Sequence, residues 1–242
     1  IFQNMGFAVA EGPEIEDDWH VFSGLNFPPE HPARDMQDTL WVDGGLCLRS
    51  HTTTVQARVL QQKPPLPVKI CAAGRVYRNE AVDATHLAMF HQFEAIWVER
   101  GLTFAHLKGT LALLAREIFG EDRRVRFKPK FYPYTEPSLG LDLACVMCDG
   151  AGCAACHGAG WVTVLGAGMV HPKVLAAGGI DPDTWQGFAF GTGSALGCFF
   201  SWLELCAAST GIMSGLLVDS VFPLPIGRTL KTFGFLASSG ES

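Results

Sequence analysis

Polar side chains interrupt an otherwise apolar part of the chain, at positions where they could bind a small charged molecule. Residues 68–99 predict two strands joined by a short polar connection at 81–86. Residues two apart share a face of a strand, so Gln92 and Glu94 of the second strand point the same way. Both faces of that strand are largely apolar, which predicts a sheet covered on both sides. An amide and a carboxylate in such an interior require partners.

Two interpretations explain these side chains. In the first, they form a satisfied polar pair or ion pair inside a large sheet. In the second, they line a pocket for a ligand that carries an ammonium and an anionic group. Glu94 would bind the ammonium, and Arg78 would bind the anion because its planar guanidinium suits carboxylate and phosphate oxygens. We favour the pocket because four polar groups fall on two adjacent strands: Arg78, Glu80, Gln92 and Glu94.

A cluster of cysteines has the spacing of a metal site. Two C-x-x-C pairs are separated by four residues, and each pair can occupy two corners of a tetrahedral zinc site. The second pair with His157 also fits a covalent haem attachment pattern, which would need export and haem ligands that the sequence does not indicate. A redox dithiol is a further alternative, but two neighbouring pairs make metal the simpler one. We predict a structural zinc that pins a hairpin between Leu143 and Trp161, with Cys145, Cys148, Cys153 and Cys156 as ligands.

The elements that would position these residues form an α+β pattern. The turn signal Asp43-Gly44 predicts a hairpin. Apolar residues recur at three- and four-residue spacings over 103–119, which predicts an amphipathic helix packed on the sheet. Thr52 or Thr53 could cap another helix. Besides the two central strands, we expect strands at 7–16, 39–42, 45–48, 125–127 and 162–165, and helices at 55–62 and 103–119.

Length and composition favour a single domain. The chain has 242 residues, of which 48% are hydrophobic, enough to bury a full core. The net charge of -6 argues against a basic nucleic-acid surface. No charged leader followed by an apolar block opens the sequence, so no signal peptide is expected. Glycines and Glu204 interrupt the apolar stretch 194–226, so no membrane segment is expected.

Several segments together carry a family resemblance. GRVYRNE at 74–80 and THLAMFHQFE at 85–94 resemble the second signature motif of class II aminoacyl-tRNA synthetases. More narrowly, the chain resembles the alpha subunit of bacterial-type phenylalanyl-tRNA synthetase. LRSHTTTVQAR upstream and YPYTEPS, GAGMVHPKVL and GFAFGTG downstream extend the likeness over roughly four-fifths of the chain.

The resemblance implies a fold and a domain organisation. The fold would be the class II type, an antiparallel sheet flanked by helices, with a small four-cysteine insertion. Residues 1–242 would form the catalytic core domain, truncated at the N-terminus, with a zinc-knuckle-like insertion at 145–161. The acidic residues near Glu16 would belong to the first class II motif, which builds the subunit interface; by themselves they would be an ordinary solvated run.

The resemblance also implies an activity. A phenylalanine carboxylate would attack the α-phosphate of ATP, and the aminoacyl group would then pass to tRNA(Phe). A beta subunit would supply most tRNA contacts, in a cytoplasmic α2β2 heterotetramer with no membrane association. Glu136 would bind Mg²⁺ jointly with that beta subunit. The implied catalytic residues are Arg78, Glu80 near the adenine, His86 near the outer phosphates, and Gln92 and Glu94 on the ammonium.

Six further positions match residues that bind the amino acid in the family. His51 and Thr53 would contact it, although by themselves they could be no more than helix-capping residues. Tyr132 and Tyr134 would form the slot for the phenyl ring, although by themselves they could be sheet aromatics. Ala189 would form the floor of that slot. The implied substrate-binding set is His51, Thr53, Gln56, Tyr132, Tyr134 and Ala189.

The sequence departs from the family pattern at several positions. Relatives usually carry phenylalanine where this chain has Tyr132 and Tyr134, and an acidic residue where it has Thr163. The position of the third-motif arginine, which stacks on adenine, matches Leu196, and we expect an aberrant tail over 194–242, scrambled or out of frame. Two alternatives to an active enzyme follow: a catalytically impaired binding or scaffold subunit, and a zinc-centred interaction module.

Overall fold

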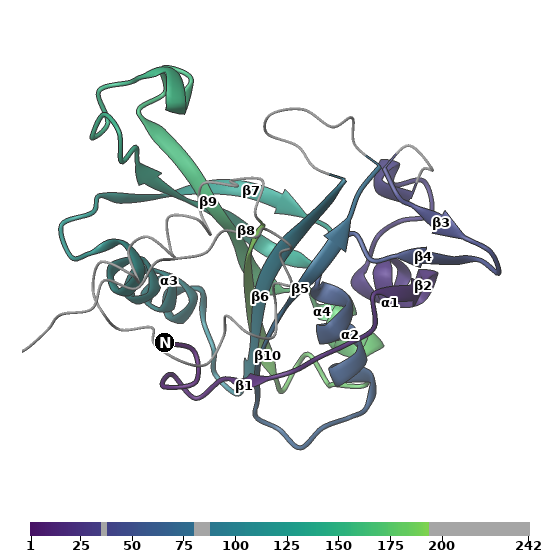
Figure 1. Cartoon of the computed structure of the whole chain (residues 1–242). Helices are drawn as coiled ribbons and strands as arrows, with labels where there is room; N and C mark the ends of the chain where they lie inside the picture. The colour runs from purple at the N-terminus through teal and green to yellow at the C-terminus, as the bar shows by residue number, and fades with distance from the viewer. Residues whose placement is uncertain (35–37, 80–87, 194–242) are drawn as a thin grey trace, which may run out of the picture. The chain divides into compact units, whose positions relative to one another are not determined.

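A computed structural model describes residues 1–34, 38–79 and 88–193 (Figure 1). Its main feature is a seven-stranded sheet in the order β1-β5-β6-β10-β9-β8-β7, beside a three-stranded sheet in the order β2-β4-β3. The strands are β1 (Ala8–Val9), β2 (Ile15–Asp17), β3 (Trp41–Val42), β4 (Leu46–Leu48), β5 (Val68–Tyr77), β6 (Met89–Glu99), β7 (Val125–Tyr132), β8 (Thr135–Ala144), β9 (Trp161–Val170) and β10 (Gln186–Gly193). The α-helices are α1 (Asp18–Val21), α2 (Thr53–Gln61), α3 (Phe104–Phe119) and α4 (Pro172–Ala177), and short 3-10 turns are η1 (Ser23–Leu25), η2 (Pro32–Arg34) and η3 (Ala154–Cys156).

The large sheet is antiparallel apart from β1, which pairs with β5 in parallel. The two central predicted strands pair directly, from Val68 opposite Val98 to Tyr77 opposite Met89. Helices flank this sheet, and the four cysteines lie in the connection between β8 and β9. The predicted fold class, an antiparallel sheet flanked by helices with a four-cysteine insertion, is therefore confirmed.

Two hydrophobic cores cover opposite faces of the large sheet. On one face, Leu107, Leu111 and Leu114 of α3 pack against buried residues of β8, β9 and β10. On the other face, residues of α1, α2 and α4 pack against β5, β6 and the end of β9. Figure 1 shows α3 on one side of the sheet and these three helices on the other. This arrangement explains why the second central strand is apolar on both faces.

Several element boundaries differ from those predicted. Helix α2 begins at Thr53, and its N-cap residue Thr52 makes no side-chain capping bond, so the capping interpretation is wrong. The predicted strand 7–16 is instead two short strands, β1 and β2, in different sheets. Strand β7 continues to Tyr132, and β9 is continuous from Trp161 to Val170. Ladder pairing completes each longer strand, β7 with β8 and β9 with both β8 and β10, and sequence periodicity does not reveal this pairing.

The acidic run after Gly12 is not simply solvated. Glu16 is 1% exposed, and Arg58 Nε of α2 donates to its Oε1 at 2.8 Å. A buried carboxylate needs such a partner, because burying it unpaired would be costly.

Within the described residues, no helix is both long enough and apolar enough to cross a membrane.

The packing of α3 allows a direct test of the first core. Leu111 is fully buried, whereas Leu113 on the same helix is 36% exposed. We expect Leu111→Ala to lower the free energy of unfolding by about 2 to 5 kcal/mol, because it removes buried methyl groups and leaves a cavity. The matched Leu113→Ala change should cost less than about 1 kcal/mol. Chemical denaturation of both variants measures the difference, and equal losses would contradict this packing.

Candidate active site

Glycines open one face of the sheet at the site. Gly74 of β5 and Gly191 of β10 lie on strands that flank β6. A Cβ atom on Gly74 would lie 2.1 Å from a guanidinium nitrogen of Arg49, and one on Gly191 would lie 2.5 Å from Cγ of Glu94. Any larger residue would collide with these side chains. The glycines therefore let Arg49 and Glu94 lie flat on the sheet surface.

Glu94 is a buried carboxylate with converging neutral donors. Thr53 Oγ1 donates to Oε1 at 3.0 Å and Gln92 Nε2 donates to the same oxygen at 2.7 Å. Gln56 Nε2 donates to Oε2 at 2.9 Å. Two of these donors lie on α2 and one on β6, so the packing of α2 against the sheet assembles the group. Thr53 thus has its hydroxyl on a carboxylate rather than on the end of the helix.

The environment of Glu94 penalises its charge. Burial raises the pKa of this carboxyl to about 7, although the Thr53 hydroxyl and the guanidinium groups of Arg78 and Arg49 act in the opposite direction. The neutral donors thus provide hydrogen bonds to the carboxylate oxygens, but they do not compensate the negative charge of the ionised form. A ligand cation bound at this carboxylate would restore its ionisation.

A cavity of about 180 Å³ joins these groups. Arg78 lies on it, with its Nε donating to the Ser50 carbonyl at 3.3 Å and its guanidinium carbon 5.0 Å from the Phe90 ring centroid. The structure therefore brings Arg78, Gln92 and Glu94 to the lining of one cavity. The other lining residues are Thr53, Gln56, Tyr132, Tyr134, Thr135, Gly166, Ala167, Ala189, Phe190 and Gly191.

Aromatic rings form one wall of the cavity. The rings of Tyr132 and Tyr134 are stacked, with centroids 5.8 Å apart and an interplanar angle of 17°. Burial raises the pKa of both hydroxyls, so both stay protonated. Ala189 of β10 lies beside Tyr134 in the lining of a smaller adjoining cavity, where its short side chain leaves space. The two tyrosines and Ala189 thus line the same cavity.

His51 occupies a different position from the rest. Its Nε2–H donates to the Val21 carbonyl at 3.0 Å, and its ring stacks on Phe27 at 6.0 Å. Burial, with a smaller contribution from the Arg78 charge, lowers its pKa to about 3, so it stays neutral. His51 is not among the cavity-lining residues, and its ring centroid lies 6.4 Å from that of Tyr134. It supports the aromatic wall from behind.

Some residues in the cavity or behind its aromatic wall had no signal in the sequence. Phe27 lies at the start of a proline-rich loop and outside the cavity lining, yet its ring centroid lies 5.8 Å from that of Tyr134. Asn26 adopts the left-handed conformation with φ 62° and donates to the Pro133 carbonyl at 2.7 Å, which ties this loop to the tyrosines. Thr135, Gly166 and Gly191 were likewise missed. Their contacts depend on strand register, which the sequence does not specify.

The remaining predicted site residues are less enclosed. Glu136 has an exposed side chain, with its Oε2 atom 3.6 Å from His171 Nε2. Within the described part of the chain, it belongs to no cluster of three or more potential metal ligands. Glu80, His86 and Leu196 lie outside the described residues, as does most of the third motif beyond Gly193.

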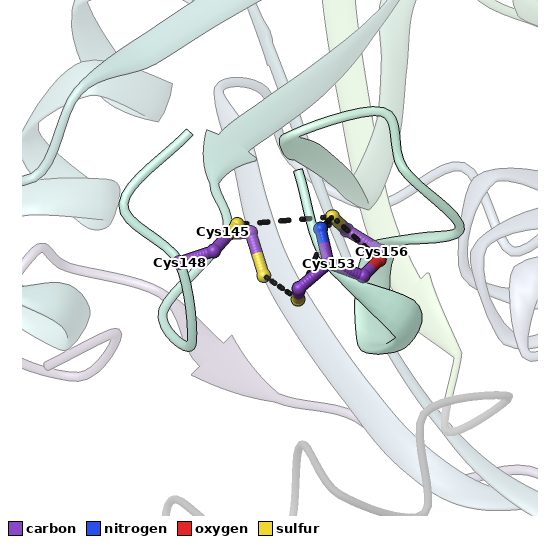
Figure 2. Close-up of side chains that lie close together, drawn as sticks. All are labelled: Cys145, Cys148, Cys153 and Cys156. Carbon is purple, nitrogen blue, oxygen red and sulfur yellow. Dashed lines mark hydrogen bonds between the residues drawn. The ribbon is translucent and has the colours of Figure 1, made fainter. Parts of the chain in front are cut away.

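The four cysteines converge at the tip of the β8–β9 connection (Figure 2). Their sulfur atoms all lie within 4.8 Å of one another, and none forms a disulfide. Three of the separations are 3.8 Å: Cys145 to Cys153, Cys148 to Cys156, and Cys153 to Cys156. Sulfurs about 2.3 Å from a tetrahedral zinc would lie about 3.8 Å apart. The group therefore has the geometry of a four-thiolate metal site.

Backbone N–H groups also favour the deprotonated form of these cysteines, because they donate hydrogen bonds to the sulfur atoms. Gly160 N–H donates to Cys156 Sγ at 3.2 Å, and Gly152 N–H donates to Cys148 Sγ at 3.2 Å. The N–H groups of Cys153 and Gly160 lower the pKa of the Cys156 thiol to about 6. Metal ligands need the deprotonated form, and such outer contacts fix their orientation. The group could hold a metal.

Comparisons with known proteins agree with this fold and site. A family model described as "tRNA synthetases class II core domain (F)" matches residues 1–195. A phenylalanine--tRNA ligase alpha subunit of Caldicellulosiruptor saccharolyticus is 54% identical over 193 residues, covering 80% of this chain and 56% of that protein. Similar proteins of the same name come from Moorella thermoacetica, at 52% identity, covering 80% of this chain and 57% of that protein, and Trichlorobacter lovleyi, at 55% identity, covering 80% and 56%.

The chain spans a little over half the length of these curated relatives, 56% to 57%. The family match covers all of the described residues, including both sheets, the cavity and the four-cysteine insertion. The chain belongs to the class II aminoacyl-tRNA synthetases, in the core-domain family of the phenylalanine type.

Proposed function

We propose that this chain is the catalytic part of a phenylalanine--tRNA ligase alpha subunit, which activates phenylalanine with ATP and transfers it to tRNA(Phe). One observation carries the proposal: a buried carboxylate, held by neutral donors, lies in the same cavity as an aromatic wall and a guanidinium. This combination matches the ammonium and ring of an aromatic amino acid, with the guanidinium placed for the α-phosphate of ATP. The names of the relatives, phenylalanine--tRNA ligase alpha subunit, support the same substrate.

The amino acid is oriented by opposite ends of the cavity. Its ammonium binds Glu94, with Gln92 beside it, because Glu94 lacks a cationic partner in direct hydrogen-bond contact among the described residues. Its ring lies against Tyr132 and Tyr134, above Ala189. Gln56 and Thr53 hold Glu94 in place, while His51 supports the tyrosines. The two tyrosine hydroxyls make this slot more polar than a phenylalanine pair would.

The reaction needs positioning more than proton transfer. The carboxylate of phenylalanine is already a nucleophile, so no general base is required. Arg78 binds the α-phosphate and offsets the charge that accumulates on its oxygens in the transition state. Magnesium, when bound at Glu136 and at the beta subunit, would supply further charge neutralisation. Glu80 at the adenine and His86 at the outer phosphates remain proposals, since both lie outside the described residues.

The partners follow from the same relatives. Their names say alpha subunit, so we infer a beta subunit. A cytoplasmic α2β2 assembly is a further proposal, which rests on the family resemblance. The four-cysteine insertion would hold a structural zinc, since its sulfur separations of 3.8 Å suit that ion. We further propose that residues 194–242 are an aberrant tail on a catalytic core domain. The family match ends at residue 195, which supports this boundary.

Phenylalanine-dependent exchange of pyrophosphate into ATP tests the function. The alpha chain, assembled with its beta subunit, should exchange label with phenylalanine and not with leucine. The rival, a catalytically impaired binding subunit, is favoured by Leu196 at the position of the adenine-stacking arginine. The other rival, a zinc-centred module, predicts no exchange at all. Lack of exchange even with the beta subunit present would overturn the enzymatic proposal.

Restoring the arginine separates the enzyme from the impaired subunit. Loss of a stacked cation costs about 1 kcal/mol or more, so Leu196→Arg should lower the KM for ATP roughly fivefold or more. Leu196→Gln is the matched control, since it adds a polar side chain without the charge. Exchange kinetics at varied ATP concentrations measure the effect. Equal KM values in all three proteins would show that position 196 does not contact adenine.

The ionised Glu94 carboxylate should lower the stability of the unliganded protein, although phenylalanine binding requires it. Its folded-state pKa of about 7 exceeds the ordinary value of 4.5. As the pH rises from about 4.5 to 7, the unfolded chain loses this proton first, so the unliganded protein loses stability. Glu94→Gln should remove this loss, roughly 3 kcal/mol at pH 8, and abolish phenylalanine binding.

Glu99→Gln is a matched control because Glu99 lies on the same strand, where its Oε2 accepts from Trp97 Nε1. Denaturation at several pH values and calorimetric binding of phenylalanine measure the two effects. A Glu94→Gln variant that binds phenylalanine as well as the parent would contradict the assigned role.

Zinc should be measurable in the purified protein. We expect about one zinc per chain, and Cys148→Ser should reduce this content and lower the melting temperature. Exchange activity should largely persist at low temperature, because the metal is structural. Cys71→Ala, a buried cysteine outside the cluster, should leave zinc content unchanged. A full zinc complement in Cys148→Ser would contradict the site.

A further inference from the structure

Strand β7 carries a concentration of positive charge that the net charge of the chain hides. Residues 123–130 read RRVRFKPK, with five basic residues and no acidic one, in a chain of net charge -6. Because side chains alternate along a strand, Arg124, Arg126, Lys128 and Lys130 fall on one face. We refer to these four residues as the cation row. Val125 and Phe127 point to the other face, into the core beneath α3.

Strand register confirms the face of the cation row. Arg126 lies opposite Asp142 of β8, and Lys128 lies opposite Gly140. A Cβ on Gly140 would lie 3.3 Å from Cγ of Lys130, so the stem of this lysine lies over the glycine. The side chains of Arg124 and Lys128 are 56% and 46% exposed. Strand β7 is the edge of the sheet, and this face is not the one beneath α3.

The acidic groups in contact with the row do not neutralise it. Asp142 is buried and accepts from Arg126 Nε at 2.9 Å and pairs with Lys128 Nζ at 2.7 Å. Asp149 lies 3.6 Å from Arg124 and 3.9 Å from Arg123. Lys130 has no carboxylate within 4.0 Å among the described residues. These contacts leave an excess of positive charge on the exposed face.

The row connects two features of the molecule. At one end, Arg124 donates to the Asp149 carbonyl in the four-cysteine insertion, and Arg126 lies 4.3 Å from the Trp161 ring centroid. At the other end comes Tyr132, whose hydroxyl covers Gly166 in the cavity. The six residue-to-residue steps from Arg124 to Lys130 span about 20 Å. The positive surface therefore runs from the insertion towards the mouth of the cavity.

We propose that the cation row binds successive phosphates of the acceptor end of tRNA as that end enters the cavity. The inference rests on the proposed function, which requires the terminal ribose to reach the activated amino acid. A row of about 20 Å exceeds the triphosphate of one ATP, and regularly spaced cations suit a repeating polyanion. An acidic protein surface is the other candidate for such charge. The continuity of the row with the cavity favours the nucleic acid.

Binding of a tRNA(Phe) transcript to the assembled alpha–beta complex tests this inference. Lys128→Gln/Lys130→Gln should weaken binding roughly tenfold at moderate salt, and should reduce the slope of log affinity against log salt by about 0.7 to 0.9 per lost contact. Asp142 keeps Arg126 and Thr163 as partners in this variant, so the fold should persist. Phenylalanine-dependent pyrophosphate exchange should stay unchanged, because it involves no tRNA.

The matched control is Lys108→Gln/Arg116→Gln. Both residues lie on α3, which packs on the opposite face of the sheet, and Lys108 Nζ lies 5.3 Å from the Phe127 ring centroid, so this control removes equal charge from the wrong side. This control should bind tRNA as the parent does. Equal weakening by both double variants, or no change in affinity and salt slope for the row variant, would overturn the inference. So would loss of beta-subunit assembly in the row variant, seen by size-exclusion chromatography, because it would assign the row to a protein interface.

The exchange assay separates this inference from the proposed function. If the row variant shows normal pyrophosphate exchange and unchanged tRNA binding, the proposed role of the cation row is rejected, but the proposed function is not. Absence of exchange in the unaltered complex rejects the proposed function, whereas a selective loss of tRNA affinity would still support the row.

Discussion

A carboxylate buried at Glu94 constrains the architecture around it. Withdrawing a charge from water is costly, so the fold must either pair it or leave it ready for a cation. Here three neutral donors satisfy its oxygens, and none of the described basic residues forms an ion pair with it. Helix α2 has to pack at one position on β6 to deliver Thr53 and Gln56. The glycine at 191 has to stay small so that the carboxylate lies flat on the sheet.

The two faces of the large sheet differ in how completely they are covered. One face is closed by α3 and the N-terminal segment, which bury the core of β8, β9 and β10. The other is closed only where α1, α2 and α4 cover it, and elsewhere carries the cavity and the cation row. An antiparallel sheet with one fully packed face can leave part of the other face for binding.

The β7–β8–β9 end of the sheet combines three kinds of polar site. The Asp142 group joins β7, β8 and β9 through Arg126, Lys128 and Thr163. The cysteine group organises the connection between β8 and β9, where a tetrahedral ion would replace a hydrophobic core that so short a segment cannot form. Arg124 links the two by its bond to the Asp149 carbonyl. The edge strand thereby keeps its charged side chains in a regular row.

The sequence by itself determined the fold class, the pairing of the two central strands, the cysteine spacing and the meeting of Arg78, Gln92 and Glu94. The fold class follows from the family resemblance and the cysteine spacing from a local motif, whereas the strand pairing and the meeting of these three side chains follow from periodicity within one hairpin. Tertiary structure alone decided the contacts of His51, Phe27 and the cavity glycines, because they depend on register between distant strands and on how loops pack. It also decided the surface charge: the total of -6 suggested no basic surface, whereas strand alternation and burial of Asp142 separate the cations onto one face.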